Sequence, residues 1–327
     1  MLIGAIDGGG TKVLAAVMTA AGTIVARRQA AVPTADIPAY FQRCAELLAT
    51  CAQEAGVAVH ALDGVGMNIP GMVTPDGHVL GSPSAGWGAF HARPLLADAL
   101  ALPGERLFFE NDINACALAE QRFGGAGDNF IWITISTGNG GAVVANGRLV
   151  RGSGGCAGEF GHLKVERESP YPCGCGGVGC LEAHASGVAI ARRAVEAGLP
   201  AGTDAKRCEE LARRGNPAAL AVYAQTGVYL GRALAIAANL LNPAHAFIGG
   251  GASKALDLML PELLRSLEND SLPQSRTLSV KRTRLGYEAA LLGAAAVCLD
   301  GLHNAESCGE RLTSRASIEP AAQAPTY

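Results

Sequence analysis

The sequence has few aromatic residues, few charged residues and no cluster of basic residues. Aromatic residues make up 5% and charged residues 17% of its 327 residues, and the formal net charge is −3 at pH 7. A nucleic-acid-binding protein needs a face rich in lysine and arginine, so we expect no nucleic-acid partner. Hydrophobic residues reach 49%, which is enough for two domains of ordinary size, each with a substantial core.

Long apolar runs are missing as well. No apolar stretch approaches the roughly twenty residues of a bilayer-spanning helix, so we expect no membrane partner. The first residues, Met-Leu-Ile-Gly-Ala-Ile-Asp, contain neither a charged leader nor the cleavage site of a secretory signal. We therefore expect a cytoplasmic protein.

The ten cysteines are spread along the chain, and in a cytoplasmic protein we expect them to be reduced. Seven stand singly in mostly apolar or helical contexts and are interpreted as ordinary core or surface residues. They are Cys44, Cys51, Cys116, Cys156, Cys208, Cys298 and Cys308. The other three, Cys173, Cys175 and Cys180, with His162 upstream, offer three thiolates and one imidazole, which is a sufficient set for tetrahedral zinc. Their spacing is not a common zinc-finger spacing, and a disulfide is the competing interpretation.

Two parts of the sequence repeat one order of strands and glycine turns. The predicted strands are 2–7, 13–19 and 24–28 in the first part, and 130–136, 142–145 and 148–151 in the second. A glycine turn follows the first strand of each part, at 8–11 and at 137–141. Glycine lets backbone N–H groups converge on phosphate oxygens. The repeat therefore predicts two related α/β halves, with a phosphate loop on each side of a cleft.

Other segments have clear periodicity or none. We predict strands at 64–68, 107–110 and 246–248, and helices at 37–55, 113–123, 187–197, 206–214, 217–241 and 256–266. Residues 304–327 are polar and aperiodic, which predicts a disordered tail.

Asn111 and Asp112 lie between a predicted strand and a predicted helix. A carboxylate there can accept the proton of a hydroxyl that attacks a phosphate. Aspartate also suits the N-cap of a helix. The residues alone leave both roles open for Asp112.

Several motifs resemble those of ROK sugar kinases, within the actin-like, hexokinase-like ATPase superfamily, over nearly the whole chain. They are Asp7-Gly8-Gly9-Gly10-Thr11-Lys12, Phe109-Glu110-Asn111-Asp112, Gly158-Glu159-Phe160-Gly161-His162, the segment from Cys173 to Glu182, and Leu241-Asn242-Pro243 with Gly249-Gly250-Gly251. The resemblance implies an α/β fold of two actin-like (ribonuclease H-like) domains around a cleft, with a small zinc-binding insertion. The expected domains are 1–117, completed by a helix near 289–301, and 118–288, with the zinc motif at 162–182.

The resemblance also implies an ATP-dependent hexose 6-kinase, with glucose as the first candidate substrate and with ATP, Mg²⁺ and structural Zn²⁺ as cofactors. We expect a homodimer or homotetramer. The expected base is Asp112, and the expected sugar contacts are Asn111, Asp112, Glu159, His162, Glu182, Gly71 and Ser84. The expected contacts to ATP and Mg²⁺ are Asp7, Gly9, Gly10, Thr11, Lys12, Thr137, Gly138, Gly249, Gly250 and Gly251. The expected zinc ligands are His162, Cys173, Cys175 and Cys180.

In this interpretation zinc organises the sugar pocket without touching the phosphate. Ligation of His162 would fix the segment that carries Glu159, and ligation of Cys180 would fix Glu182.

Other functions are weighed against this one. N-acetylglucosamine, N-acetylmannosamine and fructose are alternative substrates, because the chain departs from its relatives at Ser84, Ser136 and Asn139. A sugar-responsive regulator of the same family is disfavoured, because no helix-turn-helix domain precedes the first strand. A catalytically inactive sugar-binding protein is disfavoured, because the expected acidic and amide residues are all present.

Ser84 gives a prediction about specificity. Relatives often carry asparagine at this place before the Gly-Trp pair, and asparagine offers a donor and an acceptor where serine has one shorter hydroxyl. An unpaired sugar hydroxyl costs about 1 kcal/mol, so we expect Ser84→Asn to raise kcat/KM for glucose relative to mannose, fructose, glucosamine and N-acetylglucosamine. Steady-state kinetics of both proteins on the five sugars check this. A lower glucose efficiency in the variant would show that Ser84 already supports glucose well.

Overall fold

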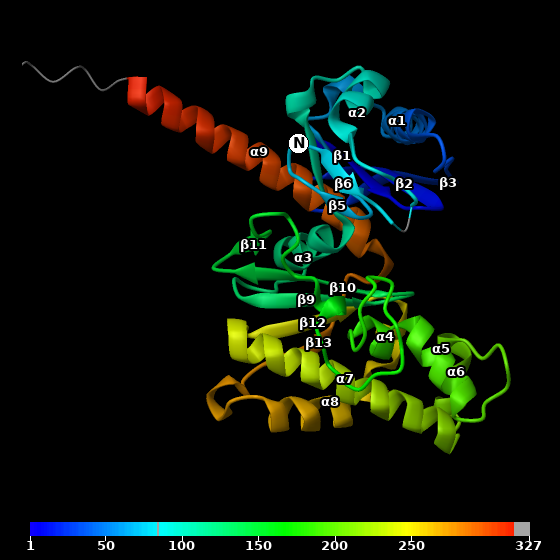
Figure 1. The fold of residues 1–327 in the computed structure, drawn as a ribbon. Coiled ribbons are helices and arrows are strands. Elements are labelled where there is room, and N and C mark those ends of the chain that lie inside the picture. The colour runs from blue at the N-terminus through cyan, green and yellow to red at the C-terminus, as the bar shows by residue number, and fades with distance from the viewer. Residues whose placement is uncertain (84, 317–327) are drawn as a thin grey trace, which may run out of the picture. The chain divides into compact units, whose positions relative to one another are not determined.

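The computed structural model describes residues 1–83 and 85–316, and Ser84 and residues 317–327 lie outside this description. The chain divides into two compact units, each built on a five-stranded sheet (Figure 1). Unit 1 contains Met1–Glu110 and the described residues from Ala294 onward, and unit 2 contains Asn111–Gly293.

The sheet of unit 1 has the order β3-β2-β1-β4-β8. Its strands are β1 (Leu2–Gly8), β2 (Lys12–Thr19), β3 (Ile24–Ala31), β4 (Val65–Ile69) and β8 (Leu107–Asn111). β1 is antiparallel to β2 and parallel to β4. Three short strands, β5 (Met72–Val73), β6 (His78–Gly81) and β7 (Phe90–His91), form a second small sheet.

Helices cover both faces of the larger sheet in unit 1. They are α1 (Ile37–Glu54), α2 (Ala92–Leu100) and the part of α9 (Ala289–Ala316) that belongs to this unit. α1 begins at Asp36, whose side chain accepts a hydrogen bond from the Ala39 N–H at 3.0 Å. The buried side chains of α1 pack on Val65, Met67 and Ile69, which are alternate residues of β4. Gly66 points to the opposite face, where any side chain would collide with the carbonyl of Ala294 in α9.

The sheet of unit 2 has the order β11-β10-β9-β12-β13. Its strands are β9 (Phe130–Ile135), β10 (Asn139–Ala145), β11 (Arg148–Val150), β12 (His245–Gly249) and β13 (Ser279–Arg282). β9 is antiparallel to β10 and parallel to β12, as β1 is to β2 and β4. The two sheets thus share one topology, which confirms the duplication predicted from the sequence.

The helices of unit 2 also lie on both faces of its sheet. They are α3 (Asp112–Phe123), α4 (Glu182–Ala185), α5 (Gly187–Glu196), α6 (Ala205–Arg213), α7 (Pro217–Leu241) and α8 (Leu256–Asp270). Ile131 and Ile133 of β9 belong to the core that includes α7 and α8. Phe130 and Trp132 point the other way and belong to the core that includes α3. Gly227 in α7 leaves no space for a side chain against the backbone of α8, so the two helices pack closely.

The predicted strands and helices are confirmed, and no end differs by more than four residues. The structure adds elements that we did not predict, namely β5–β7, β13, α2, α4 and several short 3₁₀ turns. The expectation of a disordered tail from residue 304 is wrong for its first part, because α9 continues to Ala316. Among the residues that the structure describes, none of the helices combines the length and the apolar character that a bilayer crossing requires.

Candidate active site and metal-ligand cluster

The first glycine turn belongs to unit 1 and follows β1. Asp7 lies near the end of β1, where burial raises the pKa of its carboxyl group and a hydrogen bond with Asn68 and the charge of Lys12 oppose that rise. The Gly9 N–H donates to the Lys12 carbonyl at 3.1 Å, and the Tyr40 hydroxyl donates to the Gly9 carbonyl at 3.3 Å. A Cβ on Gly9 would lie 2.6 Å from the Lys12 oxygen. The turn is therefore closed so tightly that glycine is required.

Asn111 and Asp112 form the start of α3. The Asn111 side chain is the N-cap, because its Oδ1 accepts from the Ile113 and Asn114 N–H groups at 2.9 and 3.1 Å. The alternative that Asp112 caps the helix is wrong, since Asp112 is the first helical residue. Its Oδ1 accepts from Asn111 Nδ2 at 2.9 Å and from the Ile113 N–H at 3.0 Å. These two donors fix the orientation of the Asp112 carboxylate.

Two further glycine turns lie together in unit 2. The second glycine turn is at 137–141, and the third is Gly249-Gly250-Gly251. The second is closed by the Ser136 N–H, which donates to the Gly138 carbonyl at 2.9 Å. The third follows β12, which is the parallel neighbour of β9, so the two turns start at the same edge of the sheet. Gly250 has a φ of 83°, and a Cβ there would lie 2.7 Å from the Thr134 hydroxyl oxygen. The structure therefore brings the residues around Thr137 next to those around Gly250.

His162, Cys173, Cys175 and Cys180 converge on one point. One ligand atom from each lies within 4.8 Å of all the others. The Cys173 sulfur is 3.6 Å from His162 Nδ1, and the sulfurs of Cys175 and Cys180 are 3.6 Å apart. Thiolates bound at about 2.3 Å to a tetrahedral zinc ion are about 3.8 Å apart. The four groups thus fit a zinc ion in number, chemistry and spacing.

A cation and a backbone amide lie beside these sulfurs. Lys164 Nζ donates to the Cys180 sulfur at 2.9 Å and to the Val178 carbonyl at 2.8 Å. The hydrogen bond with Cys180 raises the pKa of Lys164. The backbone N–H of Gly177 lowers the pKa of Cys175 to about 7, so this thiol ionises readily. Both neighbours favour negative charge on the sulfur that they contact, as metal ligation requires, whereas burial raises the pKa of the Cys173 thiol to about 12.

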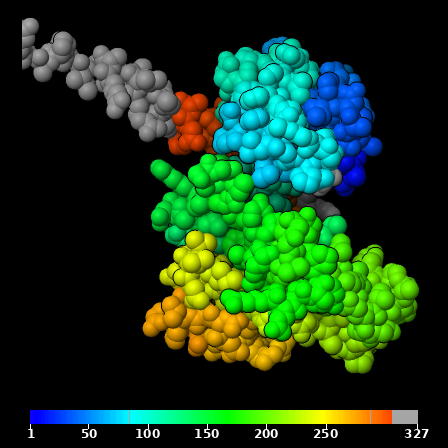
Figure 2. Space-filling model, in the orientation of Figure 1, coloured from blue at the N-terminus to red at the C-terminus, as the bar shows by residue number. Residues whose placement is uncertain are grey.

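The Gly158–His162 segment presents Glu159 beside the cluster. Glu159 Oε2 is 4.0 Å from His162 Nε2, while Nδ1 of the same ring faces Cys173. A carboxylate on the second ring nitrogen is a common way to orient a metal-binding histidine. The side chains of Glu159 and His162 are 55% and 40% exposed. The loop between β11 and α5, which carries them, contributes green atoms to the surface of unit 2 (Figure 2).

Glu182 lies between the cluster and the second glycine turn. It is the first residue of α4 and follows Cys180 by two residues. Its Oε2 accepts from the Asn139 N–H at 3.0 Å. Its Oε1 accepts from the Cys173 thiol at 3.7 Å. The carboxylate therefore touches both Cys173 of the cluster and the strand that leaves the second glycine turn.

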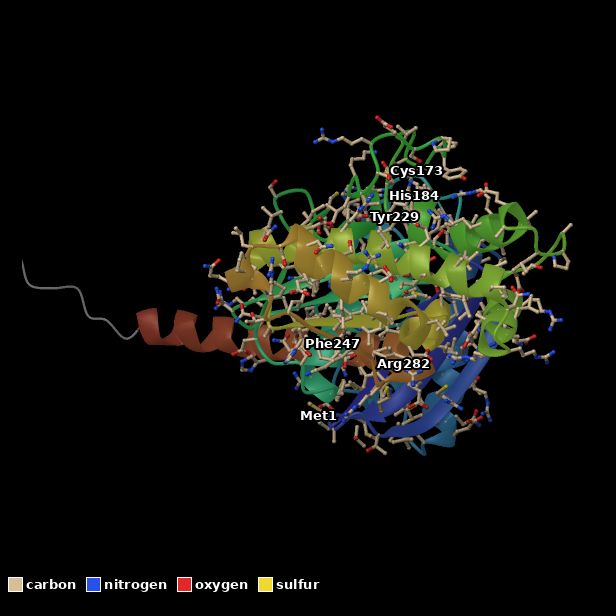
Figure 3. The ribbon with its side chains drawn as sticks, turned by 90° about the horizontal axis from the view of Figure 1, so that it is seen from below. Met1, Cys173, His184, Tyr229, Phe247 and Arg282 are labelled. Atoms are coloured by element: carbon tan, nitrogen blue, oxygen red, sulfur yellow. The ribbon has the colours of Figure 1, made fainter. Side chains whose placement is uncertain are left out.

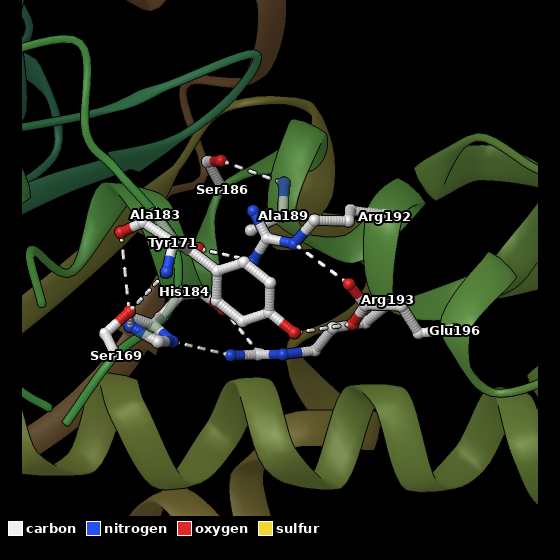
Figure 4. A network of polar contacts seen from close by, with 9 residues as sticks. All are labelled: Ser169, Tyr171, Ala183, His184, Ser186, Ala189, Arg192, Arg193 and Glu196. Carbon is white, nitrogen blue, oxygen red and sulfur yellow. Dashed lines mark hydrogen bonds and ion pairs between the residues drawn. The ribbon is translucent and has the colours of Figure 1, made fainter. Parts of the chain in front are cut away.

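A polar network that we did not predict holds α4 in place (Figure 4). His184 is 1% exposed, and its ring lies against the Tyr229 ring with centroids 4.4 Å apart and the ring planes tilted by 34° (Figure 3). Arg193 Nη2 lies 2.8 Å from His184 Nδ1, and Arg193 Nη1 donates to the His184 carbonyl at 2.6 Å. Because arginine only donates, Nδ1 accepts and Nε2 carries the hydrogen, which it gives to Ser169 Oγ at 2.8 Å.

The same network holds the chain that leads to Cys173. The Arg192 guanidinium lies 3.5 Å from the centre of the Tyr171 ring and donates to the Ala183 carbonyl at 2.7 Å. The Tyr171 hydroxyl donates to Glu196 Oε2 at 2.8 Å. Arg192 and Arg193 could not be distinguished in the sequence from arginines on a solvated helix face, so no signal pointed to this network.

All of the predicted sugar contacts remain predictions, including Gly71 and Ser84. Gly71 belongs to unit 1, where its φ is 101° and a Cβ would lie 2.7 Å from the Ser82 Cα atom. Its backbone conformation explains the glycine without any ligand. Ser84 lies outside the described residues.

Two sheets with a shared strand order, each with a glycine turn after its central antiparallel strand, define an actin-like ATPase fold. The sequence model of the ROK family matches residues 3–300. The chain belongs to this family.

Individual relatives agree with this assignment. The glucokinase of Halalkalibacterium halodurans is 34% identical over 315 residues, which cover 88% of this chain and 92% of that protein. The crystal structure of a ROK hexokinase from Thermus thermophilus matches with a TM-score of 0.78 at 31% identity, over 93% of this chain and 100% of that one. A ROK family glucokinase from Streptomyces griseus, in complex with glucose and AMPPNP, matches with a TM-score of 0.75 at 30% identity. The match covers 90% of this chain and 98% of that one.

The buried His184 gives a prediction about pH. Burial, together with the charges of Arg193 and Arg192, lowers the pKa of His184 to about 4, below its usual value of about 6.5. The unfolded chain therefore takes up a proton as the pH falls from about 6.5 towards 4, whereas the folded chain does not, and stability is lost across this range. We expect His184→Asn, which keeps an acceptor for Arg193 but does not titrate, to lose less Tm between pH 7 and pH 5 than the wild type.

Thermal unfolding at both pH values measures this difference. His60→Asn is the matched control, because His60 is exposed and its replacement should leave the pH dependence unchanged. Equal losses of Tm in the wild type and in His184→Asn would contradict the assignment of a neutral His184.

Proposed function

We propose that the chain transfers the γ-phosphoryl group of ATP to the 6-hydroxyl of a hexose, with glucose as the principal substrate. As a member of the ROK family with an actin-like ATPase fold, the chain is a phosphotransferase that acts on a sugar hydroxyl. The observation that carries the finer proposal is the Asp112 carboxylate, held by Asn111 Nδ2 and the Ile113 N–H at the start of α3. The glucokinase relatives support glucose as the sugar.

Asp112 is the proposed general base. A sugar hydroxyl must lose its proton as it attacks the γ-phosphorus, and a carboxylate within hydrogen-bond reach accepts it. A base is effective only when it is held in one orientation, because most of the catalysis in phosphoryl transfer comes from positioning. Asn111 supplies this support, and its side chain is itself fixed by the α3 backbone.

The three glycine turns are the proposed phosphate and nucleotide contacts. Backbone N–H groups near Gly10 and Gly138 would donate to phosphate oxygens, and the turn at Gly250 would lie against the adenosine. Asp7 would hold Mg²⁺ directly or through water, and the ion would supply positive charge that neutralises the phosphates. The Asn139 N–H is not part of this set, because it donates to Glu182.

The cluster of His162, Cys173, Cys175 and Cys180 is the proposed site of a structural zinc ion. Four ligand groups close the coordination sphere, and closed sites of this kind are structural. The ion would hold its two flanking carboxylates, Glu159 and Glu182, in place for the sugar hydroxyls. Carboxylates accept strongly from hydroxyl groups, which suits them to this task.

We expect Asp112→Asn to reduce kcat by about 10²–10⁴-fold, the usual contribution of a general base. Sugar affinity should change little, because asparagine keeps an oxygen at the Oδ1 position. ADP release coupled to a dehydrogenase gives kcat, and calorimetric titration with glucose gives the affinity.

Asp204→Asn is the matched control for this variant. Asp204 caps α6 in the same unit by accepting from the Arg207 N–H at 2.7 Å, and asparagine caps helices equally well. It should retain full turnover. Full turnover by folded Asp112→Asn would refute the assignment of the base.

We also expect about one zinc ion per chain in the purified protein, retained through mild dialysis because thiolate ligation is strong. Metal analysis by mass spectrometry measures the content. Cys180→Ser should lower it sharply, whereas Cys156→Ser, which replaces an exposed thiol outside the cluster, should not. Fully active protein that contains no zinc would contradict the proposed site.

A further inference from the structure

The segment from Cys180 to Val188 joins the metal-ligand cluster to the second glycine turn. Cys180 supplies one of the four ligand groups at the start of this segment. At its end, the Gly187 N–H donates to the Ser136 carbonyl at 2.7 Å, and the Val188 N–H donates to the Thr137 carbonyl at 3.4 Å. One short stretch of chain therefore contacts the cluster at one end and the turn at the other.

The Glu182 side chain also lies between the cluster and the turn. Its Oε2 accepts from the Asn139 N–H, directly after the turn, and its Oε1 lies 3.7 Å from the Cys173 sulfur. A Cys173 thiolate bound to a metal has no proton to donate to Oε1, so in the metal-bound protein Glu182 is positioned through the backbone that follows Cys180. Gly138 lies so close to this carboxylate that any side chain at position 138 would collide with it. The turn is thus bounded by Glu182 on one side and by the start of α5 on the other.

The stretch between the two contacts is itself held rigidly. Arg193 donates to the His184 carbonyl and Arg192 to the Ala183 carbonyl, so the end of α4 cannot move freely. The Ser186 side chain accepts from the Ala189 N–H at 3.2 Å and caps α5. These bonds tie α4 to α5, the helix whose first residues contact the turn.

The turn has few other supports. Ser136 and Thr137 are exposed. The next residue, Gly138, is a glycine, the residue type with the greatest conformational freedom. Apart from the hairpin pairing of Asn139 with Ile135 and the bond from Ser136 to Gly138, the hydrogen bonds of the turn within the described residues are made with Glu182, Gly187 and Val188. Ordering such a turn costs conformational entropy. The more of this cost the contacts with the rest of the protein already cover, the less of it reduces the affinity for a ligand.

We propose that the metal-ligand cluster, acting through the Cys180–Val188 segment, holds the second glycine turn in its phosphate-binding conformation, so that loss of the metal weakens nucleotide binding. This inference rests on the proposed function, which places ATP phosphates at Thr137 and Gly138 and a metal ion at the cluster. It differs from the expectation that the metal serves the sugar pocket without touching the phosphate side. Glu182 and Gly187 are positioning residues in this account.

Hydrogen exchange followed by mass spectrometry tests the structural link without any nucleotide. Zinc-loaded and zinc-depleted full-length protein are compared. We expect depletion to speed amide exchange about tenfold in residues 134–140, and to leave α8 unchanged. Calorimetric titration with AMPPNP in the absence of sugar should then show about tenfold weaker binding by the depleted protein.

Gly187→Ala separates the link from the metal itself. A Cβ at this position would lie 2.7 Å from the Ser136 oxygen, so the variant disturbs the contact with the turn and leaves the four ligand residues intact. We expect wild-type zinc content together with faster exchange in 134–140 and weaker AMPPNP binding. Gly154→Ala is the matched control, because nothing lies within 4 Å of a Cβ there.

Unchanged exchange in residues 134–140 after zinc depletion would overturn the inference, as would a failure of the protein to take up zinc. Unchanged AMPPNP affinity in both the depleted protein and Gly187→Ala would also overturn it. Zinc-loaded wild type that binds no AMPPNP would instead refute the proposed nucleotide site, and the exchange comparison would still decide whether the cluster orders the turn.

Discussion

The loop between β11 and α5 in unit 2 is constrained by the convergence of His162, Cys173, Cys175 and Cys180. The loop between β11 and α5 has little regular structure beyond a short 3₁₀ turn and the four residues of α4. A metal ion bound at the four ligand groups, as proposed, would add free energy that holds this loop in one conformation. Because Glu159 and Glu182 lie directly beside the ligand residues, a metal ion bound there would also order these two carboxylates.

The duplicated sheet supplies the second constraint. In each unit the central strand, β1 or β9, is followed by a glycine turn and pairs with a parallel strand on its other side. Parallel neighbours end at the same edge of a sheet, which is why the turn at Thr137 and the turn at Gly250 lie together. Asp112 is held in another way. It is the first residue of α3, and Asn111 before it is the N-cap of that helix.

Much of this could be predicted from the sequence, because glycine turns between alternating strands have a strong local signal. β13 was missed because Ser279–Arg282 is short and mostly polar, and α2 because Pro94 falls in its first turn. The set of three cysteines and one histidine could be predicted to suit zinc from the chemistry of the side chains alone. The roles of Glu159 and Glu182 could be predicted only from the family resemblance. The bonds from Arg193 to His184 and from Asn139 to Glu182 could not be predicted, because they depend on tertiary packing.

The central claim is transfer of a phosphoryl group from ATP to the 6-hydroxyl of glucose. Its most direct test is to incubate the zinc-loaded protein with ATP, Mg²⁺ and glucose and to identify the sugar product by phosphorus and proton NMR. The account predicts glucose 6-phosphate formed in equal amount to ADP, and no ADP in the absence of sugar. Phosphate on another carbon of glucose, or ADP release that does not depend on glucose, would contradict it.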